Sequence, residues 1–276
     1  MERLNFAKMS GAGNDFVIFD NRHHQIPQER HEFVRRVCLR RLGVGADGVL
    51  FVEPSDRADF RMAYYNADGG EVEMCGNGGR CISRYAYING IAGAEMSFET
   101  IAGLHHAKIV GDNVKLGMID PQDARLQFEI PMNGERITGN FINTGVPHVV
   151  VFVSDVEMID VVHLGSHIRY HSRFAPAGTN ANFAQIIDQH TLKIRTYERG
   201  VEDETLACGT GTVASAVTGA LLGWLASPVE AHTRSRLDLT VYFQLDGQRI
   251  YDVYLEGDAR LVFEGTLLDP WMLEAL

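Results

Sequence analysis

The sequence predicts an α+β fold of two pseudo-symmetric domains, each a mixed, mostly antiparallel sheet wrapped around a central helix. Three observations lead to this prediction. A cysteine followed by a glycine-rich turn and a helical pattern occurs at Cys75 and again at Cys208, 133 residues later (208 minus 75). The segments around each cysteine follow the same order, which indicates a duplicated domain. Short apolar segments bounded by glycine, asparagine and aspartate are typical of strands.

The composition argues against several classes of function. The chain has 276 residues, 45% of them hydrophobic, which suffices for one large domain or two of ordinary size. A formal net charge of -11 argues against binding nucleic acid or an anionic membrane through bulk charge. The N-terminal residues lack the apolar core of a signal peptide, and no apolar run is long enough to span a bilayer. The four cysteines include no Cys-x-x-Cys pair, so we expect reduced thiols in a cytoplasmic protein.

The first half of the chain alternates strand and helix patterns. Its predicted elements are a strand–turn–strand over 4–20, a helix over 29–41, strands over 49–52 and 60–65, a helix after Cys75 that ends at Asn89-Gly90, and short strands over 97–100, 103–110 and 113–118. The strand over 60–65 leads into Asn66 and from there to Cys75. The cysteine therefore lies where the chain passes from the sheet into the helix.

The second half follows the first in one register. Adding 133 maps Asp15-Phe16-Val17 onto His148-Val149-Val150, Gly45 onto Gly178, Asp47 onto Asn180, Cys75-Gly76 onto Cys208-Gly209 and Gly90 onto Gly223, and a shift of one residue places Tyr65-Asn66 on Tyr197-Glu198. Such agreement between glycine and polar positions favours duplication over chance. The composition changes at Asp120–Asp123. We therefore predict domains over 1–120 and 121–263, with the tail 264–276 returning to the first.

A cysteine at a helix start occupies a chemically special position. Unpaired N–H groups and the positive end of the helix dipole favour an anion there and lower a thiol pKa. If the two halves face each other, a small acid between them would receive N–H donors from Gly76-Asn77 and Gly209-Thr210. One thiolate would remove the α-proton while the opposite thiol protonates the other face, which inverts the stereocentre. This scheme requires no cofactor and no metal.

Five motifs make the resemblance to a known family specific. They are Gly13–Phe16, Asn66–Gly69, Met74–Arg80, Tyr197–Gly200 and Ala207–Gly211. In order and spacing they resemble diaminopimelate epimerase over essentially the whole chain. The resemblance implies a cofactor-independent isomerase of lysine and peptidoglycan precursor biosynthesis. Such an enzyme interconverts LL- and meso-2,6-diaminopimelate with two cysteines as acid and base. Members of the family are often dimeric, so a homodimer is an option that no sequence feature tests.

The resemblance also implies roles for individual residues. Cys75 and Cys208 would be the catalytic pair, and His148 together with Glu198 would tune it. The residues that would hold the substrate are Asn14, Asn66, Asn180, Glu198 and Arg199, with Gly76, Asn77, Gly209 and Thr210 at the helix starts. Two positions depart from the family pattern. Many members carry asparagine where Val146 stands and some carry glutamine where Gly48 stands, so recognition of the distal end of the substrate stays open.

Alternative interpretations accompany these assignments. Cys38 and Cys81 are better explained as small core residues, His148 as either a tuning residue or a hydrogen-bonded strand end, and Asp47 as either a turn residue or part of the site. Among enzymes, proline racemases share the fold but usually carry histidine where Asn77 stands, and isomerases of the phenazine-biosynthesis type usually lack the cysteine pair. A thiol redox or sensor protein would favour closely spaced resolving cysteines. A metal- or ligand-binding module is the remaining alternative.

Overall fold

The chain divides into two units that contain the same order of elements. The computed structural model describes residues 3–132, 135–268 and 274. The N-terminal unit comprises Met1–Leu116 and Gly257–Leu276, and the C-terminal unit comprises Gly117–Glu256. The composition change that the sequence shows at residues 120–123 coincides with the start of strand β9 at Gln122 rather than with this division.

The N-terminal unit surrounds helix α2 with strands. Its elements are β1 (Leu4–Gly11), β2 (Asn14–Asp20), α1 (His31–Cys38), β3 (Gly48–Glu53), β4 (Phe60–Asn66), β5 (Glu71–Val72), α2 (Gly76–Ile88), β6 (Glu95–Thr100), β7 (Gly103–Val110), β8 (Asn113–Gly117) and β18 (Arg260–Leu267). Strand β18, from the far end of the chain, pairs antiparallel with β1. The strands predicted over 4–20, 49–52, 60–65, 97–100, 103–110 and 113–118 are confirmed within a few residues.

The C-terminal unit surrounds helix α4 in the same way. Its elements are β9 (Gln122–Met132), β10 (Glu135–Asn143), β11 (Pro147–Phe152), the 3-10 helix η1 (Val156–Met158), α3 (Val161–Arg169), the 3-10 helix η2 (Ser172–Phe174), β12 (Asn180–Asp188), β13 (Thr191–Glu198), β14 (Asp203–Thr205), α4 (Gly209–Leu221), β15 (Val229–His232), β16 (Asp238–Asp246) and β17 (Arg249–Asp258). The helix equivalent to α2 thus starts directly after the second cysteine.

The strand pairing is equivalent in the two units. In the first, β2–β3 and β4–β6 are parallel pairs, whereas β1–β2, β3–β4 and β6–β7 are antiparallel. In the second, β11–β12 and β13–β15 are parallel, whereas β10–β11, β12–β13 and β15–β16 are antiparallel. The register is also matched, because Phe16 lies opposite Gly48 and Val149 lies opposite Ala181. The predicted mixed, mostly antiparallel sheets and their pseudo-symmetry are therefore confirmed.

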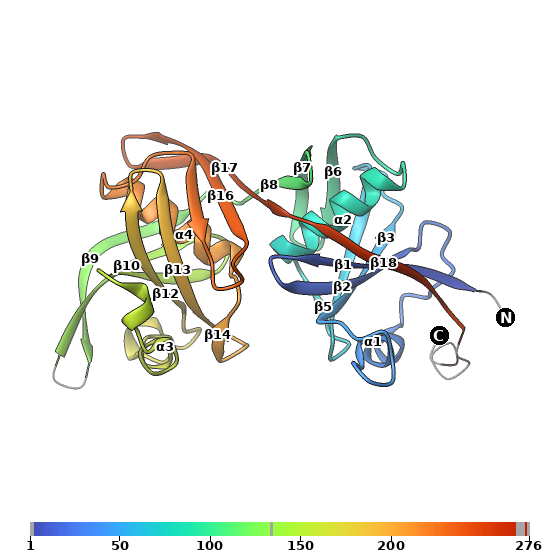
Figure 1. The fold of residues 1–276 in the computed structure, drawn as a ribbon, viewed down its shortest axis with the longest axis horizontal. Coiled ribbons are helices and arrows are strands. Elements are labelled where there is room, and N and C mark those ends of the chain that lie inside the picture. Colours follow the sequence, from blue (N-terminus) through green and yellow to red (C-terminus); the bar gives the residue numbers. More distant parts are fainter. Residues whose placement is uncertain (1–2, 133–134, 269–273, 275–276) are drawn as a thin grey trace. The chain divides into compact units, whose positions relative to one another are not determined.

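One helix of each unit is central and one is peripheral. Helix α2 contacts β1, β2, β3, β4 and β7, and Figure 1 shows it enclosed by the strands of its unit. Helix α4 likewise contacts β10, β11, β12, β13 and β16, and most of its residues are buried. Helices α1 and α3 cover the outer side of the sheets, where two clusters of buried apolar residues form. None of the helices in the described ranges has the length and apolar character needed to cross a bilayer.

Helix α1 is shorter than its sequence pattern predicts. A helix was expected over 29–41, whereas α1 runs from His31 to Cys38. Leu39 adopts an extended conformation with ψ 118°, and the chain then folds back so that the amide of Gly45 donates to the carbonyl of Val37. The positive φ of 78° at Gly45 permits this reversal. The apolar face of the helix, including Phe33, is buried as predicted.

Candidate functional site: two cysteine-led helix starts

Cys75 is the N-terminal flanking residue of α2. Its backbone is extended, with φ −140° and ψ 124°, and its carbonyl accepts the first helical hydrogen bond from the amide of Gly79 at 2.7 Å. The chain therefore changes from extended to helical at the cysteine, where the first N–H groups of the helix have no intrahelical partner. The side chain is half-buried. The predicted placement of Cys75 at a helix start is confirmed.

Cys208 occupies the same position in α4. Its φ and ψ are −114° and 109°, and its carbonyl accepts from the amide of Thr212 at 2.9 Å. The residue is only 6% exposed, and its sulfur lies 3.5 Å from the hydroxyl of Thr210. A Cβ at Gly211 would overlap Oδ1 of Asn182 and approach the Cys208 sulfur to 3.3 Å. Only glycine at this position lets the first helical turn pack so closely against the sheet.

The Asn14 side chain lies beside the sulfur of Cys75, and Asn77 contacts Asn14 in turn. Oδ1 of Asn14, at the start of β2, lies 3.8 Å from the sulfur and 3.4 Å from Nδ2 of Asn77. The amide nitrogen of Asn14 donates to Oδ2 of Asp47 at 2.7 Å. Asn77, in the first turn of α2, is held in turn by the fully buried Arg80, whose Nη2 donates to Oδ1 of Asn77 at 2.8 Å. The structure thus brings Cys75, Asn14 and Asn77 together.

Four charged side chains form a network of ion pairs that includes Asp47, the hydrogen-bond acceptor of Asn14. Asp15 pairs with Lys8 at 2.7 Å and with Arg40 at 3.0 Å, and Arg40 also reaches Asp47 at 2.7 Å. Burial opposes ionisation of Asp15, but hydrogen bonds from Arg40 and Lys8 outweigh it and lower the pKa of Asp15 to about 2. Two cations and two carboxylates therefore balance each other where β2 and β3 begin.

Asn182 organises the polar groups beside Cys208. It is fully buried, and its amide nitrogen donates to Nδ1 of His148 at 3.1 Å and to the carbonyl of Val149 at 3.0 Å. Its Oδ1 accepts from the hydroxyl of Thr196 at 3.0 Å and faces Gly211. The network thereby connects β11, β12 and β13 with the first turn of α4. A polar network inside a core is stable only when its members are paired in this way.

His148 is a buried, neutral histidine. Burial lowers the pKa of His148 to about 3, and the positive charge of Arg199 acts in the same direction. Its Nδ1 accepts from Asn182, whereas its Nε2 is buried without a hydrogen-bond partner within the described part of the chain. Buried polar atoms are rarely left unpaired, so such an atom requires an explanation. The hydrogen-bonded strand end that the sequence allowed is therefore present, but at one ring nitrogen only.

Asn180, Glu198 and Arg199 lie where neighbouring strands β12 and β13 begin and end. Oδ1 of the buried Asn180 accepts from the backbone amide of Arg199 at 2.7 Å. The guanidinium of Arg199 donates to the carbonyl of Ala177 at 3.1 Å. Burial raises the pKa of Glu198 above its ordinary value. These three residues, to which the family resemblance assigns substrate binding, are thus close neighbours in the structure.

Asn66 and the two positions that depart from the family pattern, Gly48 and Val146, lie at strand ends or in the turns beside them. Asn66 is exposed at the end of β4 and accepts a hydrogen bond of 2.6 Å from the hydroxyl of Tyr64. Its partner in β3 is Gly48, where a Cβ would lie 2.6 Å from the carbonyl of Tyr65 and 2.7 Å from the ring of Tyr64. A longer side chain at Gly48 therefore has no room in this backbone. Val146 is half-buried beside the buried Thr144, whose hydroxyl donates to the carbonyl of Thr210.

Sequence reasoning missed or left open several residues of these networks. Arg80 and Asn182 were not singled out, and Asp47 was considered equally as a turn residue. The available signals were an arginine within a glycine-rich helix start and a second asparagine two positions after Asn180. Neither signal identifies a partner. The burial of Arg80 against Asn77 is not visible in the sequence, and Asn182 contacts His148, which is 34 positions away.

The two other cysteines belong to the core. Cys38 and Cys81 are 5% and 0% exposed. Burial raises the pKa of Cys38 to about 12 and raises that of Cys81 as well. A thiol in such surroundings is a poor source of thiolate. Their interpretation as small core residues is therefore confirmed.

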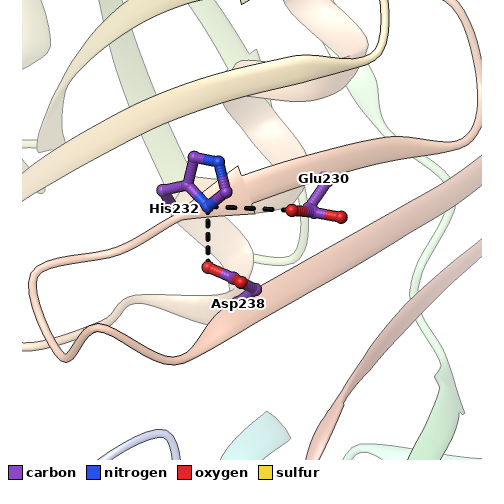
Figure 2. A group of neighbouring side chains, drawn as sticks. All are labelled: Glu230, His232 and Asp238. Atoms are coloured by element: carbon purple, nitrogen blue, oxygen red, sulfur yellow. Dashed lines mark hydrogen bonds and ion pairs between the residues drawn. The ribbon is translucent and has the colours of Figure 1, made fainter.

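One group of potential metal ligands occurs among the described residues, on β15 and β16 (Figure 2). Nδ1 of His232 lies 2.7 Å from Oδ1 of Asp238 and 3.8 Å from Oε1 of Glu230. Both carboxylates are exposed and both face the same ring nitrogen. This geometry is that of a surface ion pair that forms when His232 is protonated.

Known proteins resemble this chain in sequence along nearly its full length. The diaminopimelate epimerase family model matches residues 6–123 and 140–262. A diaminopimelate epimerase of Aquifex aeolicus (strain VF5) is 44% identical, and the match covers 96% of this chain and 98% of that protein. One from Archaeoglobus fulgidus (strain ATCC 49558 / DSM 4304 / JCM 9628 / NBRC 100126 / VC-16) is 44% identical, and the match covers 96% of each chain.

Solved structures share the fold at much lower identity. A phenazine biosynthesis protein of the PhzF family from Bacillus anthracis has a TM-score of 0.74 at 17% identity, covering 98% of this chain and 100% of that one. A hydroxyproline epimerase from Agrobacterium vitis has a TM-score of 0.71 at 17% identity, covering 98% and 94%. These likenesses establish the architecture. Together with the sequence matches over both halves, they lead to one conclusion: this chain belongs to the diaminopimelate epimerase family.

Proposed function

We propose that this protein is an isomerase that interconverts LL- and meso-2,6-diaminopimelate without pyridoxal phosphate, in the synthesis of lysine and peptidoglycan precursors. The observation that carries the proposal is the repeated placement of a cysteine immediately before a glycine-rich helix start, at Cys75 and Cys208. Inversion of a stereocentre needs one proton carrier for each face of the carbon. A duplicated fold with two equivalent thiols meets that need.

The helix starts suit the chemistry of the reaction. An α-proton is weakly acidic, so its removal requires stabilisation of the negative charge that develops on the substrate. Backbone N–H groups at Gly76-Asn77 and at Gly209-Thr210, together with the helix dipoles, supply positive potential without an ion. The same potential favours a thiolate over a thiol at each cysteine. One thiolate removes the α-proton while the other cysteine, as a thiol, protonates the opposite face.

The surrounding residues have the character needed to hold an amino acid. Asn14, Asn66 and Asn180 offer amide groups, and the guanidinium of Arg199 matches a carboxylate with two parallel donors. Glu198, whose pKa is raised by burial, and the neutral His148 would tune the proton affinity of the thiols. These roles rest on the family resemblance, and two contacts support them: Asn14 lies beside the sulfur of Cys75, and Asn182 connects His148 with the first turn of α4. A cytoplasmic location and a homodimeric state also stay predictions.

The proposal is tested by following exchange of the α-proton. The protein is incubated with diaminopimelate in heavy water, without pyridoxal phosphate and after exhaustive chelation. We expect deuterium at the α-carbon and formation of the other stereoisomer, and no exchange with proline. Activity that requires pyridoxal phosphate or a metal ion, or that prefers proline, would contradict the proposal.

Variants of the thiols make this test specific. Cys75→Ala and Cys208→Ala are each expected to abolish epimerisation with the fold intact, because each removes one proton carrier. Cys38→Ala is the matched control, since it makes the same chemical change at a buried core thiol. Turnover near the parent rate in either of the first two variants would exclude a two-base mechanism.

A further inference from the structure

The orientation of the Asn14 side chain is determined by a carboxylate. The terminal atom of Asn14 that faces Asp47 lies 2.7 Å from Oδ2 of that residue. A carboxylate only accepts hydrogen bonds, so this atom must be the amide nitrogen. The other terminal atom, Oδ1, consequently faces the sulfur of Cys75 at 3.8 Å and Nδ2 of Asn77 at 3.4 Å.

The contact between Arg80 and Asn77 leads to the same orientation of the Asn14 amide. Nη2 of Arg80 lies 2.8 Å from the side chain of Asn77. A guanidinium only donates, so Asn77 must direct its oxygen to Arg80 and its nitrogen to Asn14. The acceptor Asp47 and the donor Arg80 therefore orient the amides of Asn14 and Asn77 in the same sense, with each nitrogen directed towards Asp47 and each oxygen towards Arg80 along the series of hydrogen bonds. Arg80 is fully buried, so this end of the network is held within the core.

Asp47 is itself held by groups that do not involve Asn14. Its Oδ2 also accepts from the backbone amide of Asp15 at 3.1 Å, and its Oδ1 accepts from Arg40 at 2.7 Å. The backbone amide of Asp47 donates to the carbonyl of Asp15 at 3.0 Å. These bonds tie the carboxylate to the point where β2 and β3 begin. The carboxylate is thus a fixed reference for Asn14.

We propose that Asp47 is a positioning residue that keeps the oxygen, and not the nitrogen, of the Asn14 amide directed at Cys75. An oxygen in this place accepts from the S–H group and so favours the thiol. A reversed amide would instead donate to the sulfur and favour the thiolate. Asp47 would thereby keep Cys75 protonated in the absence of substrate, ready to deliver a proton. This catalytic meaning rests on the function proposed above, whereas the orientation itself does not.

Two substitutions of Asp47 separate orientation from charge. Asp47→Asn removes the charge but keeps one oxygen acceptor. Nδ2 of Asn14 and the backbone amide of Asp15 both donate to the position of Oδ2 of Asp47, so the oxygen of the new amide should occupy that position. Arg40, whose side chain is 61% exposed, can move away from the new NH2 group. Asp47→Leu removes the same charge, with a similar shape and no acceptor. In Asp47→Leu the Asn14 amide is oriented only by the long contact of 3.4 Å with Nδ2 of Asn77, so both amide orientations become populated. A difference between the two variants therefore reports on the amide of Asn14.

The readout is the pH dependence of alkylation of Cys75 by iodoacetamide, mapped by mass spectrometry with Cys208 monitored in the same sample. The charged and titratable groups near Cys75, namely Lys8, Asp15, Arg40, Arg80, Cys81 and Asp258, are the same in both variants. Below the midpoint of the profile we expect Cys75 to react about three- to tenfold faster in Asp47→Leu than in Asp47→Asn, because one pKa unit changes the thiolate fraction tenfold. Alkylation of Cys208 should be equal in the two variants.

A double-mutant cycle assigns the effect to Asn14. In an Asn14→Ala background the two Asp47 variants should give the same Cys75 profile. Equal profiles with Asn14 present, or a difference that persists without Asn14, would overturn the proposal. If Asp47→Leu does not fold, a neutron structure of the unaltered protein decides the question, since nitrogen directed at Cys75 would also overturn it. None of these measurements needs substrate, so they remain decisive even if the epimerase assay fails.

Discussion

The amide nitrogen of Asn182 lies 3.1 Å from Nδ1 of His148 and 3.0 Å from the carbonyl oxygen of Val149. The carbonyl accepts only, which identifies the Asn182 atom as nitrogen and therefore as the donor to the imidazole. His148 must consequently carry its proton on Nε2. Because burial also lowers its pKa to about 3, His148 is a neutral donor of fixed tautomer at neutral pH. A histidine of this kind can influence a nearby thiol without exchanging a proton itself.

We expect nitrogen NMR to show the Nε2–H tautomer of His148 from pH 8 down to pH 5. The resonance is assigned by its loss in His148→Gln. Asn182→Leu removes the donor to Nδ1 and should allow the two tautomers to mix, because nothing then distinguishes the ring nitrogens. A histidine that titrates near 6.5 in the unaltered protein would contradict the network.

The same burial predicts how stability depends on pH. Since the pKa of His148 is lowered from 6.5 to about 3 on folding, the unfolded chain takes up the proton first. Folded His148 stays neutral, so the protein loses stability as the pH falls from 6.5 towards the folded pKa of about 3, at about 1.4 kcal/mol per pH unit. Between pH 6.5 and 4 the urea unfolding free energy of the unaltered protein should fall more steeply than that of His148→Gln. Asp15, with a pKa of about 2, weakens the fold only below pH 3.8. Equal slopes would show that His148 is not buried as described.

Arg199 is predicted to set substrate preference. Arg199→Met keeps the apolar length of the side chain but removes charge-assisted hydrogen bonds worth ~1.5–3 kcal/mol each. We expect a loss of about tenfold or more in kcat/KM for diaminopimelate, by the conversion of 1.4 kcal/mol per decade. Proton exchange on short amino acids without a distal head should change little. Arg136→Met, which breaks an exposed pair with Glu129, is the matched control. Equal losses on both classes of substrate would assign Arg199 to folding or to the chemical step.

The two equivalent glycines Gly78 and Gly211 should respond differently to alanine. A Cβ at Gly211 overlaps Oδ1 of the buried Asn182, whereas a Cβ at Gly78 lies 3.3 Å from the ends of Leu50 and Met62 and 3.6 Å from Cβ of Cys75. Overpacking costs typically ~1–3 kcal/mol, while alanine in a helix gains up to about 1 kcal/mol over glycine. Urea unfolding should therefore show a clear loss for Gly211→Ala and little change for Gly78→Ala. Equal effects would mean that Asn182 can move without cost.

Arg30 and Glu53 form a buried ion pair whose disruption should be costly. Their side chains are 1% and 6% exposed, the charged atoms are 2.5 Å apart, and the guanidinium lies 4.0 Å from the centre of the Phe51 ring. Arg30→Met leaves Glu53 buried, with Arg61 and Asn21 as its remaining side-chain partners among the described residues. We expect a loss of about 3 kcal/mol in unfolding free energy. Arg57→Met, at an arginine that is 74% exposed and paired with Glu99, should cost less than about 1 kcal/mol. Comparable losses in urea unfolding would show that the burial of Arg30 contributes nothing.

Local features of the chain predicted the parts that depend on local interactions. Glycine-rich turns after Cys75 and Cys208 predicted two helix starts, because backbone freedom and unpaired N–H groups are properties of a few consecutive residues. The repetition of glycine and polar positions at a spacing of 133 residues predicted two equivalent halves, because duplicated segments adopt the same fold. The predicted helix over 29–41 was too long. The helical sequence pattern continues to residue 41, but the chain reverses after Cys38 so that the amide of Gly45 can donate to the carbonyl of Val37.

Partners across strands depended on the tertiary structure. Asp47 reaches Asn14 because β2 and β3 pair in parallel with Phe16 opposite Gly48, a register that no local pattern encodes. Asn182 reaches His148 through the equivalent pairing of β11 and β12. Hydrogen bonds between side chains require positions within a few tenths of an ångström, and only the packed sheet supplies that accuracy. The two helix-start cysteines are therefore recognised from their immediate neighbours in the sequence, whereas the orientation of the Asn14 and Asn182 amides is decided by residues more than thirty positions away.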